Sequence, residues 1–354
     1  MLSCGVYLFI STESGFRATV RIVYVLGAGA SRALVNTPLG ADLVWTYNQD
    51  CDPLVDKFSY KKFLELAGSL FLEFLGESKK FNAAEAGGLM YFAPEESLRK
   101  CHYVDEILKG MQEQGDEEGV RLLHNLVLKH ITSTGNENHR GYELLKQRCL
   151  GNKGISVVSF NFDTFLNEQQ PGPKFDYRLS FDWQDENRIS YAPQEGIPLI
   201  KLNGSLDWAV CGNGHRGLLH YFVRDNTFTG GRCRVPMCRS EIDPLIITPH
   251  ASHTSVFSSL WQEVRQILET AERIVIIGYS FPDYDTRVIQ LFRESLRKST
   301  GIEIVDVKAA LESDQQAQSR IRTRYQQLFP ALPSDQYTIC TEGLLQYIGK
   351  ASLS

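Results

Sequence analysis

The sequence RIVYVLGAGAS, from Arg21 to Ser31, joins an apolar, strand-forming run directly to five small residues. A buried strand that ends in small residues leaves room for a phosphate group to approach the backbone. A helix that starts there points free N–H groups and the positive end of its dipole at the anion. The following run, SRALVNTPLGADLVW, can supply this helix, with an interruption near Pro38. The stretch therefore predicts a nucleotide-binding turn.

This turn departs from the dinucleotide-binding pattern of ordinary dehydrogenases. That pattern has a third glycine where this chain has Arg32. It also has an acidic residue about 20 residues later on a second strand, whereas residues 44–51 are typical of helix and loop. Taken alone, the stretch could also be a strand-to-helix corner without a ligand. An ordinary dehydrogenase is therefore not expected.

Composition limits the classes of partner and location. The net charge of −5 gives no overall basic field, so binding of duplex DNA or of an anionic membrane is not expected. No apolar run is long enough to span a bilayer, and residues 1–20 lack the basic start of a signal peptide, so we expect them to be an N-terminal extension. The eight cysteines, mostly scattered singly, favour a reducing compartment and hence the cytoplasm.

Five further apolar runs predict the fold class. They are ISVVSFN from Ile155, IPLIKLNG from Ile197, PLIITP from Pro244, RIVIIGYS from Arg273 and IEIVDV from Ile302. Runs that are apolar on both faces and alternate with helical stretches predict an α/β fold, a Rossmann-like parallel sheet with helices on both faces. Ligands bind such sheets at the carboxyl ends of the strands, beside the point where the strand order reverses. The C-terminal stretch is expected to complete the sheet with a helix, a strand and a helix.

Two segments interrupt this pattern within a domain expected at residues 21–354. Residues 45–150 are mostly of helical type, with apolar residues at i, i+3 and i+4, and are too long for a simple crossover. We expect a helical insertion that forms a lid or second lobe. Residues 208–243 are rich in Cys, His, Gly and Arg and predict a small, loop-rich module.

Three more strand ends carry unusual polar residues. SFNFDT begins at Ser159, KLNGSLDW at Lys201 and IIGYSFP at Ile276. In order and spacing, these segments and the GAGAS turn resemble the sirtuin-like family, particularly its prokaryotic branch, which includes antiphage-defence NADases. The resemblance covers about residues 21–307, with the helical insertion unaligned.

The resemblance implies an NAD-binding protein that cleaves NAD between ribose and nicotinamide. Asn161 would hold the nicotinamide ribose or the attacking water, and Asp163 would accept a hydrogen bond from the nicotinamide carboxamide. The other implied NAD contacts are Gly27, Ala28, Gly29 and Ser31 at the pyrophosphate, Gly278, Tyr279 and Ser280 on the adenosine side, and Asp306 at the adenine ribose.

The chemistry of N-glycosidic cleavage fits two of these residues. Breaking the bond builds oxocarbenium character on the ribose, which nearby oxygen dipoles and carboxylates stabilise. The amide of Asn161 can also orient a hydroxyl or a water molecule. The alternative is that Asn161 and Asp163 are turn-forming residues that cap the next helix.

Asn203 stands where the family has a histidine that acts as general base. An amide cannot take up a proton near neutral pH, although it can bind the same ribose hydroxyls, and loss of a general base typically costs ~10²–10⁴ in rate. His250 or His253 could substitute. Two functions stay open: an NAD glycohydrolase, in defence or otherwise, and a catalytically weakened module that senses NAD or an ADP-ribose derivative. Protein deacetylation is the activity least favoured.

The small module contains four soft potential ligands. Cys211, His215, Cys233 and Cys238 can satisfy tetrahedral zinc, and sirtuins carry a structural zinc in the corresponding place, usually with four cysteines at tighter spacing. His220 competes with His215 for the role of nitrogen ligand. The alternative is a set of ordinary reduced thiols. The sequence also leaves open whether the chain forms a homo-oligomer or joins a defence complex.

Overall fold

The computed structural model describes eleven stretches of the chain: residues 21–35, 140–150, 154–166, 175–179, 196–218, 223–224, 227–228, 231–246, 255–283, 285–305 and 314–351. Several predictions concern residues outside these stretches. They are the extension at 1–20, most of the insertion at 45–150, and the roles of Asp306, His220, His250 and His253.

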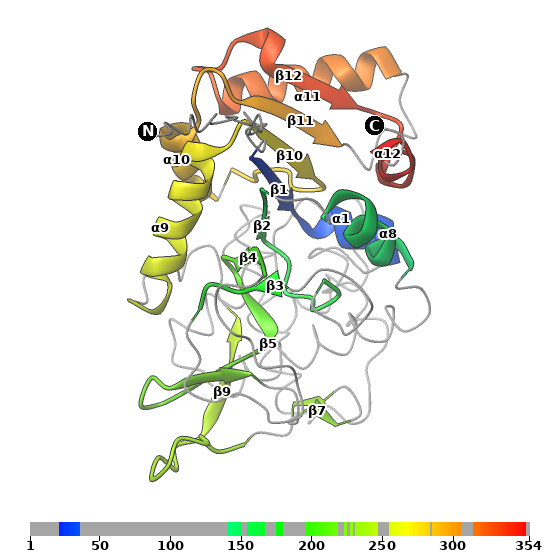
Figure 1. Cartoon of the computed structure of the whole chain (residues 1–354). Coiled ribbons are helices and arrows are strands. Elements are labelled where there is room, and N and C mark those ends of the chain that lie inside the picture. The colour runs from blue at the N-terminus through cyan, green and yellow to red at the C-terminus, as the bar shows by residue number, and fades with distance from the viewer. Residues whose placement is uncertain are drawn as a thin grey trace, which may run out of the picture.

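A seven-stranded parallel sheet forms the centre of the protein (Figure 1). Its strands are β1 (Ile22–Leu26), β2 (Ile155–Ser159), β3 (Phe175–Asp176), β4 (Ile197–Lys201), β10 (Arg273–Ile277), β11 (Gly301–Val305) and β12 (Tyr337–Cys340). The strand order is β12-β11-β10-β1-β2-β4-β3, and every pairing is parallel. The order reverses at β1, so the carboxyl ends of β1, β2 and β10 meet where ligands bind sheets of this kind.

Helices cover both faces of this sheet (Figure 1), as the apolar runs predicted. Helices α9 (Ser255–Thr270) and α10 (Thr286–Ser295) pack together on one side, and α1 (Ala28–Val35), α8 (Arg140–Cys149) and α12 (Leu344–Ala351) pack together on the other. Helix α11 (Asp314–Leu328) contacts β12, and a short 3-10 turn at Ser334–Gln336 precedes that strand. The Rossmann-like α/β fold is therefore confirmed. Within the described stretches, no helix combines the length and the apolar content that a membrane crossing needs.

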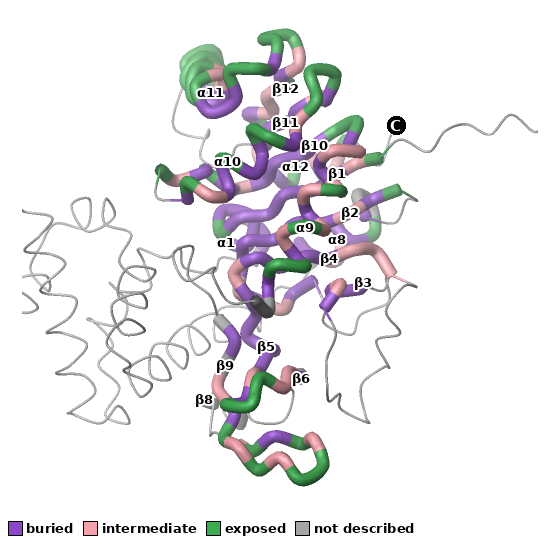
Figure 2. Tube along the Cα trace, turned by 90° about the vertical axis from the view of Figure 1, so that its left-hand side faces the viewer, coloured by how far each residue is buried: buried purple, intermediate pink, exposed green. Residues whose placement is uncertain are grey.

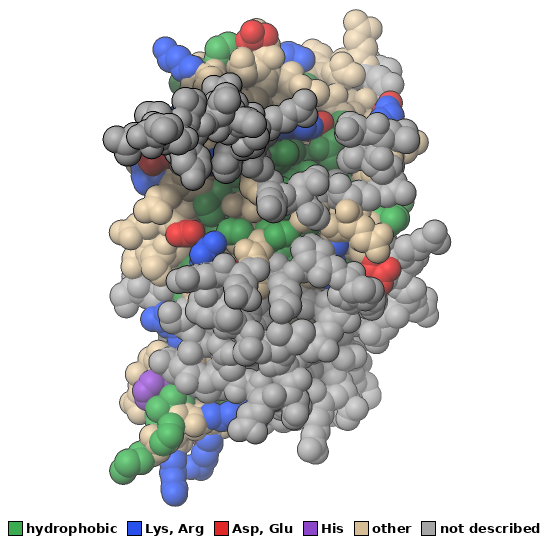
Figure 3. All heavy atoms as spheres, viewed as in Figure 1, with side chains coloured by type: hydrophobic (Ala, Val, Ile, Leu, Met, Phe, Trp, Pro, Cys, Tyr) green, Lys and Arg blue, Asp and Glu red, His purple; other side chains and the backbone are tan. Residues whose placement is uncertain are grey.

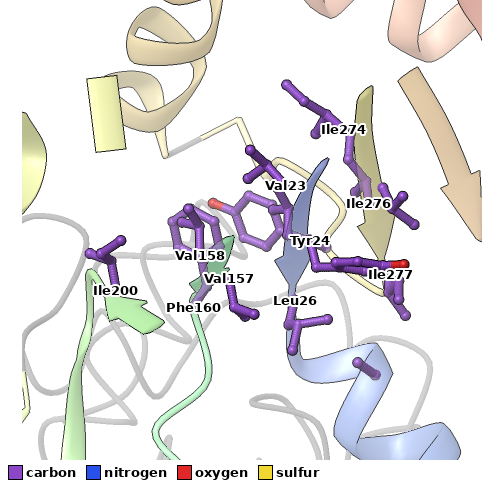
Figure 4. Packing of buried hydrophobic residues seen from close by; sticks show 14 of the residues in the cluster. Val23, Tyr24, Leu26, Val157, Val158, Phe160, Ile200, Ile274, Ile276 and Ile277 are labelled. Carbon is purple, nitrogen blue, oxygen red and sulfur yellow. The ribbon is translucent and has the colours of Figure 1, made fainter. Parts of the chain in front are cut away.

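The core lies along the three central strands. Val25 of β1 stands between Val158 of β2 and Ile276 of β10 in the sheet register, and each of the three is at most 1% exposed. Figure 4 shows these strands contributing aliphatic side chains to one cluster, and Figure 2 shows the buried residues running the length of the sheet. Fully burying each such side chain contributes about 1.5–3 kcal/mol. This packing fixes the positions of the strand ends, and with them the polar side chains that follow the strands.

The predicted strand at Pro244 does not belong to the parallel sheet, so that prediction was wrong. It forms β9 (Ile242–Ile246), which pairs antiparallel with β5 (Gly204–Cys211), and β6 (Arg216–Leu218) pairs with the other edge of β5. An apolar run of this length does not reveal its partner strand. The three strands form the base of the Cys/His module, which also contains the small hairpin β7 (Val223–Arg224) and β8 (Thr227–Phe228).

Candidate functional site

The turn after β1 packs directly against the turn after β10. The N–H of Gly29 donates to the carbonyl of Gly278 at 3.0 Å. A Cβ on Gly27 would lie 2.5 Å from that same carbonyl oxygen. A Cβ on Gly278 would lie 2.5 Å from the carbonyl carbon of Gly29, and Gly278 has a φ of +62° that disfavours other residues. Contact between the two turns is thus enough to require both glycines.

This contact changes what the glycine-rich turn can offer a phosphate group. Backbone of the second turn fills the space beside Gly27, and the N–H of Gly29 already has a partner. Helix α1 begins at Ala28, three residues earlier than the expected start at Ser31, and Ala28 is exposed. Of the residues expected at the pyrophosphate, Ala28 is the one that faces solvent at the helix N-terminus.

Asn161 lies against the same turn, just beyond the end of β2. Its side-chain Nδ2 donates to the carbonyl of Gly27 at 3.0 Å and to Oγ of Ser31 at 2.8 Å. Asn161 is 6% exposed, and its other side-chain atom, Oδ1, is buried without a hydrogen-bond partner. An unsatisfied buried acceptor costs about 1–3 kcal/mol. The arrangement therefore fits a ligand hydroxyl or a water molecule that donates to this oxygen.

The hydroxyl of Ser31 connects three side chains. Its Oγ donates to Oδ2 of Asp163 at 2.6 Å, accepts from Asn161, and lies 2.7 Å from the hydroxyl of Tyr142 on α8. A serine hydroxyl has one proton and two lone pairs, so these three bonds use its whole capacity. The side chain of Ser31 organises the site and has no hydrogen-bonding capacity left for a phosphate.

Asp163 is 7% exposed, and Ser31, Phe165 and Lys201 surround its carboxyl group. Burial raises the pKa of its carboxyl group, against the charge of Lys201 and hydrogen bonds from Ser31 and the backbone N–H of Phe165. The bond from Phe165 is the turn-forming contact of the alternative interpretation, while the bond from Ser31 ties Asp163 to Asn161. The Asp163 carboxyl group thus joins a local turn contact to the network around Ser31.

Lys201, the last residue of β4, lies beneath this turn and is 2% exposed. Its Nζ donates to the backbone carbonyls of Phe162 and Asp163. Burial lowers the pKa of Lys201, while the carboxylates of Asp163 and Asp207 favour its charged form. The lysine therefore braces the loop that carries Asn161 and Asp163.

Asn203 reaches the same edge of the sheet. Its Nδ2 donates to the carbonyl of Phe160 at 3.1 Å, directly beyond the end of β2. The structure thus gathers Asn161, Asp163 and Asn203 in the loops at the carboxyl ends of β2 and β4.

Tyr279 and Ser280 follow β10. The ring of Tyr279 stacks on Phe160 with 3.9 Å between ring centroids, and its hydroxyl donates to Asp285. Burial raises the pKa of Asp285 to about 6, with the bond from Tyr279 acting in the opposite direction. Ser280 is exposed, and its carbonyl accepts from Arg324 at 2.9 Å. The side chain of Tyr279 therefore packs the end of β10 against the end of β2, the two strands that flank β1.

The four predicted metal ligands form one cluster in the module. All their ligand atoms lie within 4.8 Å of one another. Sγ of Cys211 lies 3.9 Å from Sγ of Cys238 and 3.5 Å from Nδ1 of His215, which lies 3.6 Å from Sγ of Cys233. A tetrahedron with zinc–ligand bonds of about 2.0–2.3 Å has edges of roughly 3.3–3.8 Å. The donor set therefore fits a zinc ion.

The surroundings of these thiols differ. Burial raises the pKa of Cys233 to about 11, whereas the backbone N–H of Ser240 and the amide of Asn213 lower the pKa of Cys238 to about 6. Beside the cluster, the module surface carries basic and hydrophobic side chains, visible at the lower end of the molecule in Figure 3. The exposed residues of these kinds between residues 231 and 240 are Arg232, Arg234, Pro236, Met237 and Arg239.

Sequence reasoning gave no role to Tyr142 or Lys201. Tyr142 lies within the predicted helical insertion, and no local pattern links it to Ser31, 111 residues earlier. Lys201 did carry a signal, because it is a lysine at the end of an otherwise apolar run. Such a residue must find buried acceptors or reach solvent.

Fold and site together define a Rossmann-like α/β protein with a buried polar network at its strand reversal and a Cys3His cluster in a small module. Searches with the sequence matched no family model and no curated protein. Among solved structures, the chain is similar to sirtuins. Sir2Tm bound to a propionylated peptide shares 12% identity over 95% of each chain, with a TM-score of 0.38.

Two further sirtuin structures carry nucleotides. A Sir2 homologue in complex with ADP-ribose shares 12% identity over 94% of each chain, with a TM-score of 0.42. A Sir2 complex with p53 peptide and NAD+ shares 12% identity over 94% of this chain and 92% of that one, with a TM-score of 0.37.

Proposed function

We propose that this protein is a sirtuin-like NAD glycohydrolase. The observation that carries the proposal is the amide of Asn161, whose two donor bonds fix its orientation while its buried oxygen lacks a partner. This oxygen lies where the strand order reverses, the usual ligand position in such sheets. The resemblance of four ordered motifs to sirtuin-like proteins supports NAD as the nucleotide.

In the proposed reaction, the bond between the nicotinamide nitrogen and ribose C1′ breaks and a water oxygen adds to C1′. The products are nicotinamide, ADP-ribose and a proton. Oδ1 of Asn161 accepts a hydrogen bond from the attacking water or from a ribose hydroxyl, which fixes the position of the reacting group. The charge of Asp163 and the amide dipole of Asn161 favour the positive charge that develops on the ribose.

A module that binds NAD or an ADP-ribose derivative without turnover is the second candidate. Asn203 favours it, because an amide at this position holds a ribose hydroxyl but cannot accept its proton. The side chains of Asp163 and Lys201 are engaged in internal bonds and do not replace the missing base. A role in defence, alone or within a larger complex, is what the resemblance of the motifs implies for either candidate.

The test is to incubate the pure protein with NAD and to follow nicotinamide release by chromatography. We expect release by the wild type and a loss of at least about 100-fold in Asn161→Ala, as for other groups that position a reactant. Gln290→Ala is the matched control, because it removes an exposed amide on α10 that bonds only Glu294 among the described residues. Binding of NAD by calorimetry without release would favour the second candidate. If the protein shows no binding of NAD and no release of nicotinamide, both candidate functions are overturned.

We also propose that the Cys3His cluster holds a structural zinc. Four ligands from the protein would leave no open position for substrate, as in other structural zinc sites. The cluster belongs to a small core with Ala209 and Ile242 that is separate from the main one. The metal would therefore hold the module together and take no part in NAD chemistry.

A further inference from the structure

We propose that Tyr142 is a positioning residue for the NAD site: its hydroxyl donates to Ser31 and thereby holds the Asn161 amide with its oxygen facing the substrate. This inference rests on the proposed function. It assigns a role to α8, which belongs to the expected helical insertion and to none of the four motifs.

Close packing of two helices brings Tyr142 to the site. A Cβ on Gly141 would lie 2.6 Å from the backbone oxygen of Leu34 on α1, so glycine permits the near contact of α8 with α1. Tyr142 is 1% exposed, and its ring packs against Phe165 with 5.4 Å between centroids. Both contacts limit where its hydroxyl can lie.

The other two hydrogen bonds of the Ser31 hydroxyl determine which atom donates in its bond with Tyr142. The one proton of the Ser31 hydroxyl goes to Asp163, and one of its lone pairs accepts from Asn161. Only the second lone pair is left for Tyr142, so Tyr142 is the donor. Burial and the charge of Asp163 raise the pKa of Tyr142 well above its ordinary value, against its hydrogen-bond interactions with Ser31 and Asn161, so the phenol keeps the proton it donates.

Loss of the Tyr142 hydroxyl would make the position of the Ser31 hydroxyl, which accepts the bond from Asn161, less well defined. The Nδ2 group of Asn161 donates two bonds, and one of them ends on Ser31. With Tyr142 absent, the Ser31 hydroxyl has only Asp163 and Asn161 to set its rotamer. A small misplacement of a positioning group affects the transition state more than ground-state binding. The consequence should therefore be seen in kcat.

The experiment compares Tyr142→Phe with Tyr337→Phe in the full chain. Tyr337 is also buried, and its hydroxyl donates to the backbone carbonyls of Tyr325 and Phe329 at 3.3 and 3.1 Å, so it controls for the loss of a buried phenol. We expect Tyr142→Phe to lower kcat for nicotinamide release by about tenfold, with KM within about twofold. Tyr337→Phe should keep the wild-type kcat.

A double-mutant cycle tests whether Tyr142 acts through Ser31. We expect Ser31→Ala to lower kcat at least as much, and the double variant to lose no more than Ser31→Ala alone. Wild-type kcat in Tyr142→Phe, or losses that multiply in the double variant, would overturn the inference. If Tyr142→Phe does not fold, the Ser31→Ala variant tests the inference, and a wild-type kcat in Ser31→Ala overturns it.

The outcome stays separable from that of the proposed function. If the wild type binds NAD without cleaving it, the glycohydrolase proposal fails. Without a chemical step, the Asn161 oxygen can act only on bound NAD. Tyr142→Phe must then weaken NAD binding in calorimetry by more than the limit of about twofold set for KM, relative to Tyr337→Phe, and the inference fails if it does not. If the wild type neither binds nor cleaves NAD, both fail.

Discussion

Asn161 shows how a single side chain can be prepared for a ligand. The fold satisfies its two amide protons and leaves its oxygen buried and unsatisfied. Such an atom lowers the stability of the unliganded protein, and a donor from the ligand recovers that loss on binding. The sequence predicted a ligand contact at this residue, which stays a prediction, and the contacts with Gly27 and Ser31 decide that the oxygen is the side-chain atom left without a partner.

Asn203→His is expected to raise nicotinamide release. Nδ1 of a histidine occupies nearly the same place as Nδ2 of asparagine, so it can keep the bond to the carbonyl of Phe160. The other ring nitrogen is then free to accept a proton near neutral pH. We expect kcat to rise by about 10²-fold, the lower end of the contribution of a general base, measured with saturating NAD. An unchanged kcat with unchanged KM would contradict this explanation of Asn203.

Asp285 is expected to make stability depend on pH. Burial raises the pKa of its carboxyl group to about 6, above that of the unfolded chain, so the folded state holds the proton more tightly. Stability from this group is therefore present below about pH 4 and is lost as pH rises through about 6. Asp285→Asn keeps an acceptor for Tyr279 and removes the titration. Between pH 4 and pH 7, the free energy of unfolding of the variant should rise relative to that of the wild type by roughly 2 kcal/mol, measured by urea unfolding. An equal difference in the free energy of unfolding between variant and wild type at pH 4 and pH 7 would contradict this role of Asp285.

At the scale of elements, the two turns after β1 and β10 act as one unit. Gly27 and Gly278 are needed where the turns touch, and Phe160 stacks on Tyr279 beside them. Glycines in a strand-to-helix turn of this kind are usually attributed to the close approach of a ligand. In this fold, contact between two chain segments already accounts for both glycines.

Gly278→Ala tests this packing. Its Cβ would overlap backbone atoms of Gly29 and Ala30, and alanine disfavours the φ of +62°. We expect a loss of about 3 kcal/mol in the free energy of unfolding, measured by urea titration. Gly349→Ala is the matched control in α12, where a Cβ meets nothing within 4 Å, and helix propensity predicts a gain of about 0.5–1 kcal/mol. Equal effects of the two variants would exclude steric contact as the reason for Gly278.

At the scale of the whole molecule, the described residues form two cores of different size. The larger one fills the α/β fold, and the smaller one surrounds the Cys3His cluster. Among the described residues, the smaller core contains four buried residues, Ala209, Cys211, Cys233 and Ile242. A core of this size contributes little stability by itself, and small units of this kind usually need a metal or disulfides.

The purified protein is expected to contain about one equivalent of zinc, measured by mass spectrometry. Cys233→Ser should lower the zinc content and make the module sensitive to proteolysis, because it removes one of the four ligands. NAD binding should persist if the metal is structural. Cys340→Ser is the control, since Cys340 lies on β12 outside the cluster. Zinc loss in that control, or full zinc content in Cys233→Ser, would contradict the assignment.

The sequence by itself determined the parallel sheet, the strand ends that carry Asn161, Asp163 and Asn203, and the four Cys and His residues that form the cluster. These features are local, because apolar runs and the residues that end them are properties of short segments. The tertiary structure decided that β9 joins β5, that the turn after β10 fills the space at Gly27, and that Tyr142 reaches Ser31. Each of these contacts joins segments that no local pattern pairs, and its geometry depends on how all the elements between them pack.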